Sequence, residues 1–146
     1  MNRSRVTLWA ALTAANLLFI WGNSLLPGET SGAISGGIFT WLTGLTGADG
    51  GFGELLLRKL GHFTEFACLG ALLWRLCREL GQKGIHAFTM PLLGGVLAAV
   101  LDETIQVFVP GRGPSVLDVW IDTAGLCGGL ILVAIGYHYK RKTKKS

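Results

Sequence analysis

Ionisable side chains inside apolar segments are the feature that most constrains this fold. Residues 6–26, 55–74, 85–109 and 116–139 are each long and apolar enough to cross ~30 Å of hydrocarbon as a helix. The last three segments carry polar groups within or at the edge of the apolar run, namely Arg58, Lys59, His62, Glu65, Asp102, Glu103, Gln106, Asp118 and Asp122. An ionised side chain in a bilayer costs about 3 kcal/mol or more, so we expect these groups to face a shared polar interior.

The composition agrees with a membrane protein. Half of the 146 residues are hydrophobic and only 15% are charged, which is unusual for a soluble domain. Little chain remains between the four segments. We therefore predict an all-α fold, with residues 1–146 forming a single membrane domain built on four transmembrane helices. The first segment begins like a signal peptide, but its long apolar run and the lack of a small-x-small cleavage site before Pro27 favour a retained helix.

Basic residues predict the orientation. Most of the 13 Lys and Arg residues fall in three clusters that share one side of the four-span topology: Arg3 and Arg5; Arg75, Arg78 and Lys83; and the Lys and Arg residues of the tail, 140–146. This pattern predicts that both termini and the middle loop are cytoplasmic. Basic and aromatic residues do not interleave as they do on a nucleic-acid-binding surface, so nucleic acid is not an expected partner.

Residues 28–53 connect the first two spans and contain no Lys or Arg. Apolar side chains recur there at helical spacing, at Ile34, Ile38, Leu42 and Leu45. Ser31 is available as an N-cap. We predict a short amphipathic helix on the outer membrane surface, with a flexible linker as the alternative.

Carboxylates on three segments are expected at a similar depth. At 1.5 Å per residue, Glu65 lies ~15 Å below the outer end of its helix, Asp102 ~10 Å and Asp122 ~9 Å. Each helix presents one polar stripe, because its polar residues are spaced by three, four or seven positions. Hydrocarbon avoidance should turn the three stripes toward one another.

The loop before the fourth span should hold a cation above these carboxylates. Pro110 and Pro114 stiffen it, Arg112 lies between them, and Ser115 can cap the following helix. Arg58 and Lys59 are expected nearby, where they would complete a cationic mouth. The alternative is an ion-pair network that only holds the bundle together, although buried ion pairs contribute little net stability.

These residues carry a family resemblance. Residues 58–70, which contain Lys59, His62-Phe63 and Glu65, resemble the K-xx-HF-xEY-xx-LG motif of VanZ-like membrane proteins. Residues 102–125 resemble the second signature of that family, DE-xx-Q…PGR-xx-S-xx-DV-xx-N-xx-G. Two positions depart from the pattern: Phe66 stands where Tyr is frequent, and Asp122 stands where Asn is usual.

The resemblance implies a multi-pass protein of the bacterial cytoplasmic membrane, associated with resistance to the glycopeptide antibiotic teicoplanin. It supplies no reaction. Our first hypothesis is a cell-envelope protein that binds an anionic lipid or an envelope precursor in an outward-facing pocket. The residues expected to bind it are Arg58, Lys59, Gln106, Arg112, Ser115 and Asp122.

Two further functions stay open. One is an intramembrane enzyme that acts on a phosphorylated lipid by acid/base chemistry, with His62, Glu65, Asp102, Glu103 and Asp118 as the candidate catalytic residues. In a metal-assisted version, a divalent cation binds through oxygen to Glu65, Asp102, Glu103 and Asp118. The other is a small transporter, which intramembrane acids favour and the short chain disfavours.

Overall fold

The computed structural model describes residues 3–46 and 51–143, and these ranges contain five α-helices and no strand. The predicted all-α class is therefore confirmed. The helices are α1 (Arg3–Ser24), α2 (Gly28–Thr46), α3 (Gly51–Glu79), α4 (His86–Val107) and α5 (Val116–Thr143). Of the predicted apolar side chains in the second segment, Leu42 and Leu45 lie outside the described residues.

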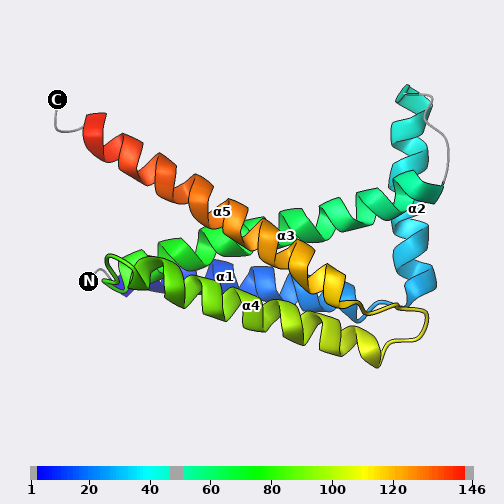
Figure 1. Ribbon diagram of the computed structural model, residues 1–146, viewed down its shortest axis with the longest axis horizontal. Helices are drawn as coiled ribbons and strands as arrows, with labels where there is room; N and C mark the ends of the chain where they lie inside the picture. Colours follow the sequence, from blue (N-terminus) through cyan, green and yellow to red (C-terminus); the bar gives the residue numbers. More distant parts are fainter. Residues whose placement is uncertain (1–2, 47–50, 144–146) are drawn as a thin grey trace.

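Four helices run along the length of the molecule and α2 runs across one end (Figure 1). The start of α1, the α3–α4 turn and the end of α5 lie at the opposite end from α2 and the α4–α5 loop. The basic clusters that begin at Arg3, Arg75 and Lys140 therefore share one end of the bundle, as their spacing predicts.

Within the part of the chain that the structure describes, three helices are long and apolar enough to cross a membrane: Arg3–Ser24, His86–Val107 and Val116–Lys140. Large apolar side chains such as Leu18, Leu93 and Leu132 are exposed on their outer faces. Outward apolar surface of this kind is stable in lipid, because hydrocarbon solvates it as well as a protein core does. The chain thus has the helices of a membrane protein.

Helix α3 is not among these candidates, and it carries the charged residues that open the sequence argument. It begins earlier than residue 55 and continues past residue 74, so its predicted bounds were too narrow. The prediction for α2 also needs a correction. This helix begins at Gly28, directly after Pro27, so that Ser31 lies within the first turn and not at the cap.

Glycines bring α3 and α5 into backbone contact. A Cβ atom on Gly125 would lie 2.2 Å from the carbonyl oxygen of Phe63, and one on Gly129 would lie 1.8 Å from that of Ala67. The reverse contact occurs at Gly70, where a Cβ would lie 2.3 Å from the Leu126 carbonyl oxygen. Gly125 and Gly129 form a G-xxx-G spacing in α5, a pattern that lets two helices approach closely.

The apolar core surrounds this contact. Its buried members come from four helices, and they include Ile20, Phe66, Ala98, Ala99 and Leu126. Phe66 is fully buried among apolar groups, where a tyrosine hydroxyl would need a partner. The core thus accommodates the departure from the family pattern at this position.

We expect Gly129→Ala to destabilise the protein by about 1–3 kcal/mol, since the added methyl group overlaps the α3 backbone and must push two helices apart. Thermal unfolding of the detergent-solubilised protein measures the effect. Gly136→Ala is the matched control on the same helix, because a Cβ there has no neighbour within 4 Å among the described residues. Equal losses in both variants would contradict the proposed backbone contact.

Candidate functional site

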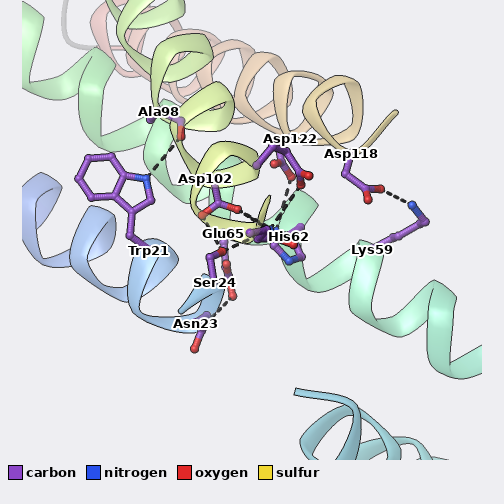
Figure 2. Close-up of polar contacts among 12 residues, drawn as sticks. Trp21, Asn23, Ser24, Lys59, His62, Glu65, Ala98, Asp102, Asp118 and Asp122 are labelled. Atoms are coloured by element: carbon purple, nitrogen blue, oxygen red, sulfur yellow. Dashed lines mark hydrogen bonds and ion pairs between the residues drawn. The ribbon is translucent and has the colours of Figure 1, made fainter. Parts of the chain in front are cut away.

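Three polar side chains meet where α3, α4 and α5 converge (Figure 2). The Nδ1 atom of His62 lies 3.9 Å from Oδ2 of Asp102 and 3.8 Å from Oδ1 of Asp122. Both aspartates are completely buried, while 19% of the His62 side chain is exposed. The expected convergence of polar stripes from three helices is therefore observed.

Asp102 is held by hydrogen bonds on both oxygens. The Ser24 hydroxyl donates to Oδ1 at 2.7 Å, and Nε2 of Gln106 donates to Oδ2 at 3.0 Å. The same amide nitrogen also lies 3.4 Å from Oε1 of Glu103. Because Ser24 is the last residue of α1, a fourth helix takes part in the cluster.

Asp122 lacks comparable support. None of the described residues hydrogen-bonds to either of its carboxyl oxygens, and Nδ1 of His62 is likewise buried without a hydrogen bond. A buried carboxylate without partners costs several kcal/mol, so native proteins rarely retain one without a reason. The pair of Asp122 and His62 is therefore the least satisfied part of the cluster.

The Glu103 carboxylate binds the loop between α4 and α5 and lies outside the closest contacts of His62, Asp102 and Asp122. Its Oε2 accepts the backbone N–H of Ser115 at 2.8 Å. The Ser115 hydroxyl in turn accepts the N–H of Leu117 at 3.1 Å, which confirms Ser115 as the N-cap of α5.

Glu65 turns toward α1. Its Oε1 accepts a hydrogen bond of 3.0 Å from Nδ2 of Asn23, while Oε2 is buried without a partner in the described structure. Glu65 thus stands beside the cluster of His62, Asp102 and Asp122 and outside its closest contacts (Figure 2).

The three cations of the predicted mouth have different surroundings. Lys59 forms an ion pair with Asp118. Arg112 donates from Nε to the carbonyl oxygen of Leu26 at 2.9 Å and from Nη2 to that of Asn23. Within the described ranges, Arg58 forms neither a hydrogen bond nor an ion pair, and its side chain is exposed.

Arg112 therefore clamps the α1–α2 corner, which the sequence did not indicate. Carbonyls at a helix C-terminus carry partial negative charge, and a guanidinium there is stabilising. Burial is the main cause that lowers the pKa of Arg112, and the neighbouring Arg58 charge lowers it further. A guanidinium nevertheless stays protonated at neutral pH.

Two glycines make the corner tight. The N–H of Gly28 donates to the carbonyl of Pro110 at 3.0 Å, and a Cβ on Gly28 would lie 1.8 Å from the carbonyl oxygen of Gly111. Gly111 has a φ of 74°, a conformation that favours glycine. The α4–α5 loop is thus packed directly on the start of α2.

A small polar pocket opens at this end of the bundle. It encloses about 20 Å³, roughly the space that one water-sized particle needs. Cations, carboxylates and an imidazole line it together, among them Arg58, Lys59, His62, Glu103, Arg112 and Asp122.

A larger groove of about 580 Å³ adjoins the pocket. Its walls come from α1, α2 and α3, and they are mainly apolar, with Phe19, Leu26, Ile34, Ile38, Leu57 and Leu60 among the lining residues. The groove and the pocket share Arg58, His62 and Arg112. The apolar groove and the charged pocket are therefore neighbours that have these three side chains in common.

The donors that can hold a metal differ from those expected. His62, Asp102 and Asp122 offer ligand atoms that all lie within 4.8 Å of one another. Of the four carboxylates that the sequence suggested as metal ligands, only Asp102 belongs to this set. Glu65 is hydrogen-bonded to Asn23 and Glu103 to Ser115, while Asp118 forms an ion pair with Lys59. The sequence did offer a sign of the second carboxylate ligand, because Asp122 stands where the family pattern usually has Asn.

We expect Arg112→Gln to lower the free energy of unfolding by about 1.5–3 kcal/mol, because hydrogen bonds from a charged donor to two helix-end carbonyls are lost. Arg58→Gln removes the same charge from an exposed side chain that has no partner among the described residues, and should change stability little. Thermal unfolding in detergent compares the two variants. If both variants lose a similar amount of stability, the cause is the lost positive charge and not the lost hydrogen bonds of Arg112.

Similarity to known proteins is found at the level of a protein family. No curated protein and no solved structure gives a significant match to the chain. The family model described as VanZ/LLP1 matches residues 5–137, a range that contains every residue of the site described above. Because this match covers most of the chain, the protein belongs to the VanZ/LLP1 family.

Proposed function

We propose that this VanZ-family membrane protein acts at the bacterial cell envelope and binds a phosphate-bearing lipid or a lipid-linked envelope precursor. One observation carries the proposal: the polar pocket and the apolar groove share Arg58, His62 and Arg112 as lining residues. A phospholipid or polyprenyl phosphate has the same order of parts, with an apolar chain that ends in an anionic group.

The groove suits the hydrocarbon chain. Its apolar residues Phe19, Ile34, Ile38 and Leu60 are substantially exposed, so a hydrocarbon chain can lie against them. A volume of about 580 Å³ also lies within the range of ordinary small-molecule sites.

Arg58 suits the headgroup. A guanidinium binds phosphate through two parallel hydrogen bonds, and Arg58 has no competing partner among the described side chains. Glu103, Asp118 and Asp122 also line the pocket, and their carboxylates repel an anion. The phosphate is therefore assigned to the mouth, between Arg58 and Arg112.

The proposal includes a membrane topology. Helix α3 is taken as the fourth span, because it packs against α1, α4 and α5 and its His62 and Glu65 side chains contact residues of those helices. The end that holds α2 and the pocket then faces outward, with α2 on the outer surface and both termini cytoplasmic. One membrane domain accounts for the whole chain.

A second candidate function is an enzyme that acts on the same class of lipid. Its support is the imidazole of His62, which lies beside two buried carboxyl groups at the edge of the pocket. Release of inorganic phosphate from polyprenyl phosphate, lost in His62→Gln, would favour this candidate over binding alone.

We expect the purified protein to retain phosphatidylglycerol and polyprenyl phosphate in preference to phosphatidylcholine of matched chain length. Arg58→Gln should weaken retention of the anionic lipids about 10-fold, which corresponds to the loss of one charge-assisted contact of ~1.4 kcal/mol. Native mass spectrometry of the detergent-solubilised protein measures both effects.

The control for this experiment is Lys83→Gln, which removes one positive charge in the turn at the opposite end of the bundle. It should leave the lipid preference unchanged. If Arg58→Gln retains the anionic lipids as well as the unaltered protein does, the headgroup assignment is wrong.

We also expect expression of the protein in a teicoplanin-susceptible bacterium to raise the inhibitory concentration of the antibiotic, and Arg58→Gln to reverse the increase. The reason is that protection, on this proposal, acts through the bound envelope lipid. Growth inhibition assays measure it, with membrane levels of each variant determined by immunoblot. If an Arg58→Gln variant present at normal levels still protects fully, resistance does not depend on lipid binding at Arg58.

A further inference from the structure

We propose that His62, Asp102 and Asp122 form a binding site for one divalent cation of the Mn²⁺ or Zn²⁺ type. The three residues come from three helices and supply one imidazole nitrogen and two carboxylate oxygens. This inference stands independently of lipid binding, since none of its steps requires an occupant in the groove.

The separations between donor atoms suit a single ion. Two donors that bind one ion at about 2.1 Å each lie at most ~4.2 Å apart. Nδ1 of His62 lies 3.9 Å from Asp102 and 3.8 Å from Asp122, so both of these pairs meet this condition. All three ligand atoms, including the Asp102–Asp122 pair, lie within 4.8 Å of one another. The mixed nitrogen and oxygen set favours Mn²⁺, Fe²⁺ or Zn²⁺ over Ca²⁺ and Mg²⁺, which prefer oxygen alone.

Asp122 supplies the independent observation that a ligand is required. It is completely buried, and neither of its oxygens has a hydrogen-bond partner among the described residues. Its carboxyl group lies in the same cluster as the unpartnered Nδ1 of His62 (Figure 2). A cation between these atoms would satisfy both groups at once.

Charge supports the same conclusion. Two carboxylates close together in a low-dielectric bundle repel each other, and two of the three cations that line the adjoining pocket are engaged elsewhere: Lys59 with Asp118, and Arg112 with the end of α1. The third, Arg58, has an exposed side chain. One divalent ion neutralises two carboxylates. The cluster then carries no net charge inside the bundle.

The surroundings of Asp102 resemble those of metal ligands. Ser24 and Gln106 donate to its two oxygens and fix the orientation of the carboxylate. Such partners of a ligand typically change metal affinity by about 10- to 100-fold. The adjoining pocket borders His62 and Asp122 and has room for one further oxygen ligand from solvent.

The test uses full-length protein in detergent, with any affinity tag removed, and Mn²⁺ alone as the probe. Mn²⁺ is suitable because it avoids thiolates, and its electron paramagnetic resonance spectrum distinguishes free from bound ion. We expect one bound Mn²⁺ per chain. Asp122→Asn and His62→Gln should each weaken binding at least about 10-fold, since a direct ligand matters no less than its supporting partners.

Glu79→Gln is the control, as it removes one carboxylate from α3 near the opposite end of the bundle. Its Mn²⁺ affinity should match that of the unaltered protein. The proposal is overturned if the unaltered protein binds no Mn²⁺, or if Asp122→Asn and His62→Gln bind it as well as Glu79→Gln does.

Thermal unfolding provides a second readout that misfolding cannot imitate. In chelator, Asp122→Asn should be at least as stable as the unaltered protein, because an amide is cheaper to bury than an unpartnered carboxylate. Mn²⁺ should raise the melting temperature of the unaltered protein and of Glu79→Gln, and leave that of Asp122→Asn unchanged. If Mn²⁺ raises the melting temperature of Asp122→Asn equally, the ion binds elsewhere and the proposal fails.

Discussion

The burial of two aspartates beside one histidine is the constraint on which the rest of the structure depends. Asp102 and Asp122 have no access to solvent, so the helices around them must supply polar partners or a counter-charge. For Asp102 the supply is complete, because Ser24 and Gln106 reach it from α1 and α4. For Asp122 the supply of polar partners is incomplete. The close α3–α5 contact at the glycines nevertheless holds its carboxyl group beside His62.

Much of this arrangement could be predicted from spacing. Helical periodicity placed the polar residues of each segment on one stripe, and hydrocarbon avoidance required the stripes to meet, as they do at His62, Asp102 and Asp122. The cap at Ser115 and the close approach at Gly125 follow from equally local rules. Predictions of this kind succeed because they depend on the helix repeat alone.

Other features depend on tertiary packing and could not be read from the sequence. Whether Glu65 faces Asn23 or the other carboxylates depends on how α1 is rotated relative to α3, which no local pattern fixes. Arg112 was expected above the acids, but its guanidinium reaches the carbonyl oxygens of Asn23 and Leu26 at and just after the end of α1, which are acceptors close to the loop. The family pattern also usually has an amide at position 122, so the charge at the centre is a property of this chain and not of the pattern.

The clamp at the α1–α2 corner has a mechanical consequence. Because the Arg112 loop bonds to the end of α1 and packs on Gly28, the near end of α2 is anchored, while the rest of that helix packs mainly against α3. Any widening of the groove must then come from a swing of α2 about this hinge. The opening would be smallest beside the charged mouth and largest at the far end, so that the entrance could adapt to tails of different bulk while the headgroup seat kept its shape.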